Sequence, residues 1–219
     1  MRNFSGRLFG GSCFLCRGPG RGLICDACDA DLPRLGAEVC PRCALASPGG
    51  QLCGRCLSNP PHYDATVAAL AYAFPADTLV QSLKFRGELA LSSLLGKLLA
   101  DRIARETVDR VIAVPLSPVR LRDRGYNQSV EIARHVMRSK LDLDTCVRTR
   151  EAPPQMGLPF DERRRNVRGA FECTRSLVGE RIAVVDDVMT TGATLDEVAR
   201  SLKRAGATYV VNWVVARTA

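Results

Sequence analysis

Histidine and aromatic residues are scarce in this chain, and it has no long hydrophobic run. Two histidines occur among 219 residues, and aromatic residues make up 5% of the sequence with a single tryptophan. His62 and His135 stand at no spacing that suits a metal site or a catalytic triad, which excludes histidine-based centres and predicts that both lie on the surface. The longest uncharged apolar stretch, 210–216, is far shorter than the roughly 20 residues that a membrane-spanning helix needs.

The N-terminal segment MRNFSGRLFGGSC lacks the apolar core of a signal peptide, so the sequence predicts a cytoplasmic protein. The composition, 46% hydrophobic and 25% charged, is typical of a soluble globular protein. Ten cysteines in a reducing compartment indicate metal binding rather than disulfide bonds.

Eight of the cysteines form four C-x-x-C pairs, which are Cys13/Cys16, Cys25/Cys28, Cys40/Cys43 and Cys53/Cys56. Two thiolates at this spacing reach one metal, and two pairs complete a tetrahedral site with no open position for chemistry. The sequence therefore predicts two structural Zn²⁺ ions. Sequential pairing suits two small ribbons in tandem, while interleaved pairing and an iron–sulfur cluster remain alternatives. Cys146 and Cys173 lack partners at ligand spacing and are predicted to be core or surface thiols.

The chain is predicted to divide at the consecutive prolines Pro60 and Pro61, into a cysteine module, 1–58, and an α/β domain, 59–219. In the α/β domain the expected strands are 66–74, 108–114, 182–185 and 209–216, and the expected helices are 75–85, 89–106, 128–138 and 194–205. The helix over 75–85 is expected to bury Leu79, Leu83 and Phe85. Alternation of continuous apolar strands with helices predicts a parallel sheet that helices cover on both faces.

The strand 182–185 is expected to end in two adjacent carboxylates, Asp186 and Asp187, followed by a loop of small residues and a helix. Such a turn aims backbone N–H groups and the positive end of a helix dipole at one point, which suits a phosphate. Carboxylates repel phosphate unless ribose hydroxyls or a divalent cation lie between them. Thr194 and Glu197 have the spacing of a capping box, which predicts that the helix begins at Thr194.

Basic residues gather in two segments of the α/β domain, and the whole chain has a net charge of +8. Arg120, Arg122 and Arg124 lie in an expected loop from Pro115 to Gly125. A second long loop is expected over 149–170, and it contains three consecutive arginines, 163–165. Basic loops in a domain that also has a phosphate-type turn favour an anionic ligand.

The segment VVDDVMTTGAT resembles the 5-phosphoribosyl-1-pyrophosphate (PRPP) motif of type I phosphoribosyltransferases, in which hydrophobic residues and two acids precede T-T-G-x-T. The chain also contains, in order, the four C-x-x-C pairs, LKFRGE (83–88), VPLSPVRLRDRGYNQS (114–129) and RNVRGAF (165–171). In these motifs it resembles the ComF family of bacterial DNA-uptake and DNA-utilisation proteins over nearly its whole length. The resemblance implies a type I phosphoribosyltransferase-like parallel sheet flanked by helices and preceded by a small double zinc-ribbon module.

The resemblance also implies roles for single residues. Asp186 and Asp187 would accept hydrogen bonds from the ribose hydroxyls, and Arg124 and Gly125 would bind pyrophosphate. Together with Arg124, the two acids would form the catalytic set. The 5-phosphate would be held by the loop residues Thr190, Thr191, Gly192, Ala193 and Thr194. Mg²⁺ would bridge pyrophosphate and ribose oxygens, and the loop 150–170 would close over the reaction as a flexible hood.

Two functions follow from these features. The first is a transferase that moves phosphoribose from PRPP to an acceptor, with the segment 213–217 as the floor of the acceptor site. The second is a non-catalytic zinc-ribbon adaptor that binds single-stranded DNA or DNA-uptake proteins and uses the PRPP site as a sensor. A positive charge balance suits nucleic acid, whereas the shortage of aromatic residues leaves few side chains for base stacking.

Overall fold

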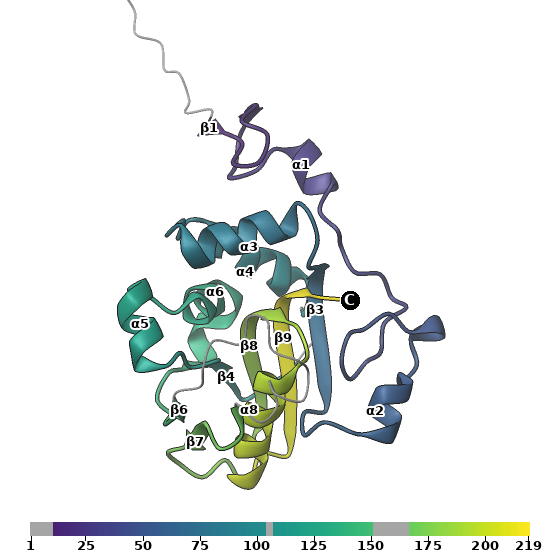
Figure 1. The fold of residues 1–219 in the computed structure, drawn as a ribbon, viewed down its shortest axis with the longest axis vertical. Helices are drawn as coiled ribbons and strands as arrows, with labels where there is room; N and C mark the ends of the chain where they lie inside the picture. The colour runs from purple at the N-terminus through teal and green to yellow at the C-terminus, as the bar shows by residue number, and fades with distance from the viewer. Residues whose placement is uncertain (1–10, 104–106, 151–166) are drawn as a thin grey trace, which may run out of the picture.

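A five-stranded parallel sheet forms the centre of the molecule, in a computed structural model that describes residues 11–103, 107–150 and 167–219 (Figure 1). The strands, in their order across the sheet, are β3 (Ala65–Ala71), β9 (Tyr209–Arg217), β8 (Arg181–Met189), β4 (Arg110–Ala113) and β5 (Leu141–Asp142). Each neighbouring pair is parallel, with Ala183 of β8 opposite both Val111 of β4 and Val211 of β9. The predicted parallel sheet is confirmed.

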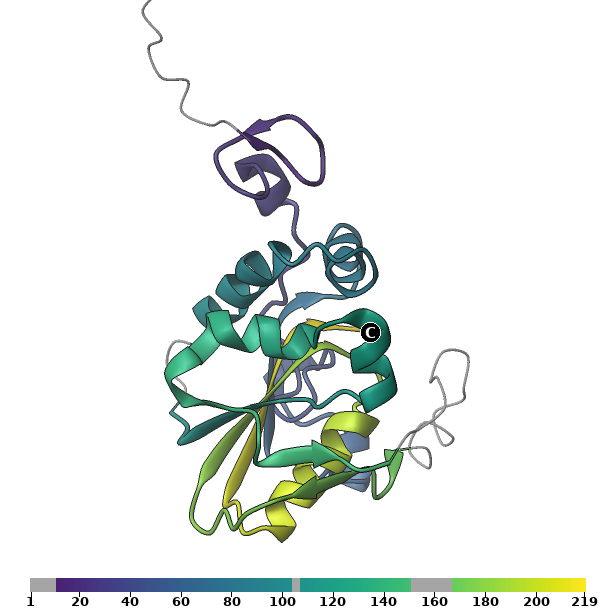
Figure 2. The same cartoon turned by 90° about the vertical axis from the view of Figure 1, so that its left-hand side faces the viewer.

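Helices cover both faces of the sheet, as Figure 2 shows. They are α3 (Ala76–Phe85), α4 (Leu91–Arg102) and α6 (Gln128–Met137) on one face and α8 (Ala193–Arg204) on the other. Side chains of β8 alternate between the two cores: Ala183 and Val185 pack toward α3, α4 and α6, whereas Ile182 and Val184 pack toward α8. Among the described helices, none has the length and apolar character to cross a bilayer.

Several short elements complete the described fold. The N-terminal part contains β1 (Gly11–Ser12), β2 (Pro19–Gly20), α1 (Asp26–Ala30), η1 (Pro48–Gly50) and α2 (Gly54–Ser58). The α/β part adds α5 (Pro118–Arg124), η2 (Arg138–Lys140), β6 (Cys146–Arg148) and β7 (Phe171–Cys173). The last two pair as an antiparallel ribbon apart from the main sheet.

The two halves of the N-terminal module lie in different places. Its first half, with β1, β2 and α1, stands at one end of the molecule, whereas its second half, with α2, lies beside β3 (Figure 1). The connecting segment 33–41 forms backbone hydrogen bonds with β3: Leu35 N–H donates to Ala69 O and Ala71 N–H donates to Pro33 O. This segment covers an edge that would otherwise present unpaired backbone groups.

The expected loop from Pro115 to Gly125 was wrong, because its central part is the helix α5. The Ser117 hydroxyl accepts a hydrogen bond from Arg120 N–H, Pro118 occupies the first turn, and Gly125 ends the helix with a φ of 81°. A serine cap, an early proline and a terminal glycine are ordinary helix signals. They were present in the sequence, but the prolines favoured the loop interpretation.

The predicted capping box of α8 was also wrong. The N-cap is Gly192, and Thr194 lies inside the first turn. The Glu197 carboxylate instead accepts a hydrogen bond from Gly169 N–H and pairs with Arg200 at 2.5 Å. The capping-box pattern assigned the Glu197 side chain to the N-terminus of the helix, but contacts with Gly169 and Arg200 engage it instead.

Two other predictions differ from the structure, and a third falls outside the described residues. Phe85 is 69% exposed, although the helical pattern placed it on the buried side of α3. The helix predicted over 89–106 ends at Arg102, and residues 104–106 lie outside the described part. Most of the predicted hood, including the arginines 163–165, also lies outside the described residues.

Gly96 allows the close approach of α4 to α6. A Cβ at this position would lie 2.6 Å from His135 Cβ and 2.9 Å from Ile132 O. Gly96→Ala would raise helix propensity by about 1 kcal/mol, but we expect a net destabilisation of roughly 1–3 kcal/mol because the helices must move apart. Urea unfolding measures the change, with the exposed Lys97→Ala as the control on the same helix. A stabilised Gly96→Ala protein would contradict the close packing.

Candidate functional site

The two acidic residues lie within the carboxyl end of β8, which continues past the predicted end at Val185 to Met189. Asp187 is only 2% exposed, and Asp186 is half-buried. One carboxylate oxygen of Asp186 accepts hydrogen bonds from the Ser129 hydroxyl at 2.9 Å and from Asp187 N–H at 3.0 Å. The pair is therefore fixed by the first turn of α6 as well as by its own strand.

Lys84, at the end of α3, forms an ion pair with one member of the acidic pair, Asp187. Its Nζ lies 2.8 Å from Asp187 Oδ2. Burial alone would lower the pKa of Lys84, but the charge and hydrogen bond of Asp187 outweigh it and the pKa is raised. The role of Lys84 was not predictable from local sequence, because nothing local links the end of one helix to a strand about a hundred residues later. The one sequence feature that could have pointed to Lys84 as a site residue is its place in the motif LKFRGE.

Asp186 is held in an environment that disfavours its charge. Burial and the neighbouring charge of Asp187 raise the pKa of Asp186 well above its usual range, and Lys84 and the Ser129 hydroxyl offset this only in part. A ligand that donates hydrogen bonds to Asp186 would favour the ionised carboxylate. Hydroxyl donors fit this position better than anions do.

A basic hollow lies beside the acidic pair. Its volume is about 290 Å³, and it is lined by Lys84, Phe85, Gly87, Arg120, Asp123, Arg124 and Tyr126. Arg120 and Arg124 are one helical turn apart on α5, and the Arg124 guanidinium lies over the Phe85 ring at 5.4 Å and donates to Gln128. Arg122 is exposed and does not line the hollow. Three cations against one carboxylate suit a polyanion.

The glycine- and threonine-bearing loop follows β8 directly and leads into α8. Gly192 has a φ of 80°, and a Cβ there would lie 2.7 Å from Met189 Cε and 3.1 Å from the Tyr63 hydroxyl. The Thr191 hydroxyl accepts a hydrogen bond from Ala193 N–H at 3.2 Å. The first turn of α8 presents N–H groups and a positive dipole end, which together suit an anion. Whether this loop holds a phosphate stays a prediction.

A buried arginine joins this loop to the N-terminal module. Arg217 is 3% exposed; its Nε donates to Cys43 O at 2.8 Å and its Nη1 donates to Met189 O at 2.9 Å and to Thr190 O. Arg55 of α2 also donates to Thr191 O at 3.5 Å. The segment 213–217 therefore supports the loop from beneath. Trp213 is fully buried in the core, and a role of this segment as the acceptor floor stays a prediction.

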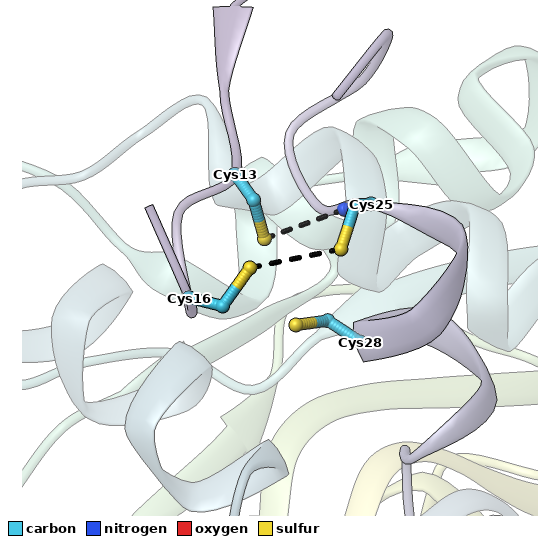
Figure 3. A group of neighbouring side chains, drawn as sticks. All are labelled: Cys13, Cys16, Cys25 and Cys28. Atoms are coloured by element: carbon cyan, nitrogen blue, oxygen red, sulfur yellow. Dashed lines mark hydrogen bonds between the residues drawn. The ribbon is translucent and has the colours of Figure 1, made fainter. Parts of the chain in front are cut away.

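The eight paired cysteines form two separate clusters of four, Cys13/Cys16/Cys25/Cys28 and Cys40/Cys43/Cys53/Cys56. Figure 3 shows the four thiols of the first cluster pointing toward one centre, with the Sγ atoms of Cys16 and Cys25 3.7 Å apart. The Sγ atoms of Cys43 and Cys53 are 3.6 Å apart. Zinc–sulfur bonds of about 2.3 Å in a tetrahedron place sulfurs roughly 3.8 Å apart, so both clusters fit Zn²⁺. Pairing is sequential, and the interleaved alternative is excluded.

Comparison with known proteins agrees with this arrangement. Residues 5–57 match the double zinc ribbon domain family, and residues 93–218 match the phosphoribosyl transferase domain family. The chain is 37% identical to the DNA utilization protein YhgH of Escherichia coli O157:H7, over 95% of this chain and 97% of the relative. It is 31% identical to Competence protein F of Haemophilus influenzae, over 99% of this chain and the whole relative.

The chain belongs to the ComF family. Competence protein ComFC of Streptococcus pneumoniae is a further relative, 26% identical over 89% of this chain and 87% of its own length. Membership confirms the predicted combination of a double zinc ribbon with a phosphoribosyltransferase-like sheet. It also supports structural zinc as the metal of the two cysteine clusters.

In this ComF-family protein the structure brings most of the predicted site residues to one edge of the sheet. Asp186 and Asp187 lie near the carboxyl end of β8, and Arg124 lines the basic hollow beside them. Residues 190–192 form the loop after β8, and Ala193 and Thr194 begin α8. Gly125 follows Arg124 as the C-cap of α5 and is not among the residues that line the basic hollow. The assignment of these residues to parts of PRPP stays a prediction.

Proposed function

We propose that this protein binds PRPP with Mg²⁺ and transfers its phosphoribosyl group to an acceptor, with release of pyrophosphate. The observation that carries the proposal is the position of the acidic pair next to both the basic hollow and the phosphate-type loop. Lys84 contacts Asp187 and also lines the basic hollow, while the phosphate-type loop begins just beyond the pair. A ligand with hydroxyl groups between two phosphate groups fits this order, and PRPP has that composition.

In this proposal each group of residues binds a different part of PRPP. Asp186 and Asp187 accept hydrogen bonds from the ribose hydroxyls, and the loop 190–194 with the first turn of α8 holds the 5-phosphate. Arg124 and Lys84 bind pyrophosphate in the basic hollow. Mg²⁺ would enter with PRPP beside the carboxylates of Asp186 and Asp187, would take most of its ligands from PRPP, and would supply charge neutralisation.

Catalysis in this site is mainly electrostatic. The bond from the ribose carbon to pyrophosphate breaks as the acceptor's nucleophile bonds to the same carbon. Arg124 and Lys84 stabilise the negative charge that grows on the leaving pyrophosphate. The carboxylates of the acidic pair, held on β8, stabilise the positive charge that develops on the ribose ring.

Thermal unfolding tests the proposed ligand. At a PRPP concentration of 100 times Kd, with Mg²⁺, binding stabilises the folded protein by about 2.7 kcal/mol, which raises Tm by roughly 5–10 °C. An unchanged Tm at millimolar PRPP would overturn the proposal. Release of pyrophosphate with a panel of nucleobases and nucleosides then separates a transferase from a sensor.

Binding is also expected to depend on pH. Because the pKa of free Asp186 is raised and ribose hydroxyls favour its charged form, PRPP binding should release a proton. As pH falls below the raised pKa, affinity should weaken by up to about tenfold per pH unit. Titration calorimetry in two buffers of different ionisation enthalpy measures the released proton.

Two controls make the pH experiment specific. Pyrophosphate lacks ribose hydroxyls, so its binding reports phosphate protonation alone. Ser129→Ala removes a hydrogen bond that favours the charged form of Asp186, and should move the pH dependence to higher pH. If affinity for PRPP and for pyrophosphate changed equally with pH, the assignment of Asp186 to the ribose would be wrong.

A second candidate function rests on the position of the first ribbon, which stands apart from the sheet (Figures 1 and 2). Arg17 and Arg21 are exposed there, and the Arg17 guanidinium lies 5.6 Å from the centre of the Phe14 ring. An adaptor that binds single-stranded DNA would use these groups, and the names of the relatives suit a role in the use of imported DNA. This candidate requires DNA binding that weakens steeply with salt and is lost in Arg17→Ala/Arg21→Ala.

A further inference from the structure

Cys146 and Cys173, the two cysteines outside the zinc clusters, lie directly opposite each other. They are Cα partners in the antiparallel pairing of β6 with β7. From the sequence, both were expected to be core or surface thiols without partners at metal-ligand spacing, because 26 residues separate them and neither belongs to a C-x-x-C pair. The ribbon brings them together.

Their position in the ribbon suits a covalent bond. Thr174 N–H donates to Thr145 O and Thr149 N–H donates to Ala170 O, so these flanking positions are hydrogen-bonded pairs. Because the two kinds of pair alternate, Cys146 and Cys173 form a non-hydrogen-bonded pair, in which the Cα atoms approach to about 4.5 Å. A disulfide accepts Cα separations of roughly 4.4–6.8 Å. The backbone therefore needs no rearrangement.

The two thiols differ in a way that suits stepwise oxidation. Cys146 is 3% exposed, whereas Cys173 is partly exposed and lies 3.5 Å from the Ser201 hydroxyl. The hydrogen bond from the Cys146 thiol lowers the pKa of Cys173 to about 7, and the same interaction raises the pKa of Cys146. Cys173 is thus the accessible nucleophile, and Cys146 is held beside it as the second thiol.

We propose that Cys146 and Cys173 are a redox-active pair that forms a reversible cross-strand disulfide when it meets a low-molecular-weight disulfide. The Cys173 thiolate attacks one sulfur of the small disulfide and expels the other as a thiolate. Cys146 loses its proton to solvent, attacks Cys173 Sγ and expels the second small thiolate. Two protein thiols are oxidised and one small disulfide is reduced to two thiols.

The bond would join the two strands that bracket residues 149–170 and would tie β6 to β7, which contacts α8 through Cys173 and Ser201. It uses none of the eight zinc ligands. The proposal does not depend on PRPP binding.

Peptide mapping of the zinc-loaded protein tests the proposal. After equilibration with oxidised glutathione, alkylation and trypsin digestion, residues 141–148 and 169–175 should appear as one disulfide-linked peptide. We expect at least a tenfold loss of both free peptides and their full return after reduction with dithiothreitol. Zinc content measured in the same sample should be unchanged.

Two variants separate this pair from general thiol oxidation. In Cys146→Ser, Cys173 should be recovered as a mixed disulfide with glutathione, because the second thiol is missing. In Cys173→Ser, Cys146 should remain reduced, since it is buried. Recovery of both free peptides from the oxidised parent protein, or Cys173 captured only by glutathione or by a zinc-ligand cysteine, would overturn the proposal.

Discussion

Asp186→Asn is expected to stabilise the free protein and to abolish its response to PRPP. Partial burial and repulsion by Asp187 disfavour the charge of the wild-type carboxylate, so removal of that charge should raise the free energy of unfolding by about 1–2 kcal/mol. An amide oxygen can still accept from the Ser129 hydroxyl and from Asp187 N–H. The amide is a weaker acceptor for ribose hydroxyls than a carboxylate is, and we expect at least a hundredfold loss of PRPP affinity.

The stabilisation by Asp186→Asn should depend on pH with a definite sign. A group whose pKa is raised by folding contributes its stability below its unfolded pKa, near 4, and loses that contribution as pH rises toward the folded value. The advantage of Asp186→Asn over the parent should therefore be absent in acid and grow as pH rises through this range. Urea unfolding across the range measures it.

Asp187→Asn provides the matched contrast. It removes the close partner of Lys84, whose side chain is 27% exposed, so we expect a loss of roughly 1–3 kcal/mol. If Asp186→Asn stabilises the protein, Asp187→Asn destabilises it and both lose PRPP binding, the loss of binding cannot be an effect of altered folding stability. Retention of the PRPP-induced Tm shift in both variants would show that the acidic pair is not the ribose site.

Loss of the second zinc cluster is expected to disable PRPP binding at a distance. Cys53→Ser should reduce the zinc content from two ions to one and weaken PRPP affinity at least tenfold, although Cys53 is not predicted to touch the ligand. Structural zinc supplies on the order of 10–16 kcal/mol of folding free energy to such a small ribbon. Without it, the Arg217 contact to Cys43 O and the Arg55 contact to Thr191 O would lose their fixed partner.

The first zinc cluster provides the control for this experiment. Cys16→Ser should also remove one zinc ion, but its ribbon stands away from the phosphate-type loop, so PRPP affinity should stay within about twofold of the parent. Arg217→Lys keeps the charge and both zinc ions but cannot bridge three carbonyls in a fixed plane. It should weaken PRPP binding as Cys53→Ser does. Equal effects of Cys16→Ser and Cys53→Ser would contradict the coupling of one ribbon to the loop.

The parts of the structure that were predictable from sequence depend on local patterns. C-x-x-C spacing gave the zinc clusters, apolar strands alternating with helices gave the parallel sheet, and two acids before a glycine-threonine loop gave the candidate site. Each signal lies within about twenty residues. The start of α8 and the burial of Phe85 were less predictable. Packing against neighbouring segments, rather than helical periodicity, decides the positions of the Glu197 and Phe85 side chains.

The parts that were missed join distant segments. Lys84 meets Asp187 through the packing of α3 against the end of β8, and Arg217 meets Cys43 across almost the whole chain. Cys146 and Cys173 meet only because β6 and β7 pair in one particular register. No local pattern specifies such contacts, which arise from topology.

The order of strands in the sheet has a consequence for folding kinetics. β9 lies between β3 and β8, so the sheet cannot be completed until contacts form across 146 residues, as in the hydrogen bond from Asn212 to Thr66. Each zinc cluster closes within a short stretch of chain and carries a far smaller loop-closure entropy. We therefore expect the ribbons to bind metal early and the sheet to assemble late. The segment 33–41 would then lie between two zinc-bound ribbons before it pairs with β3.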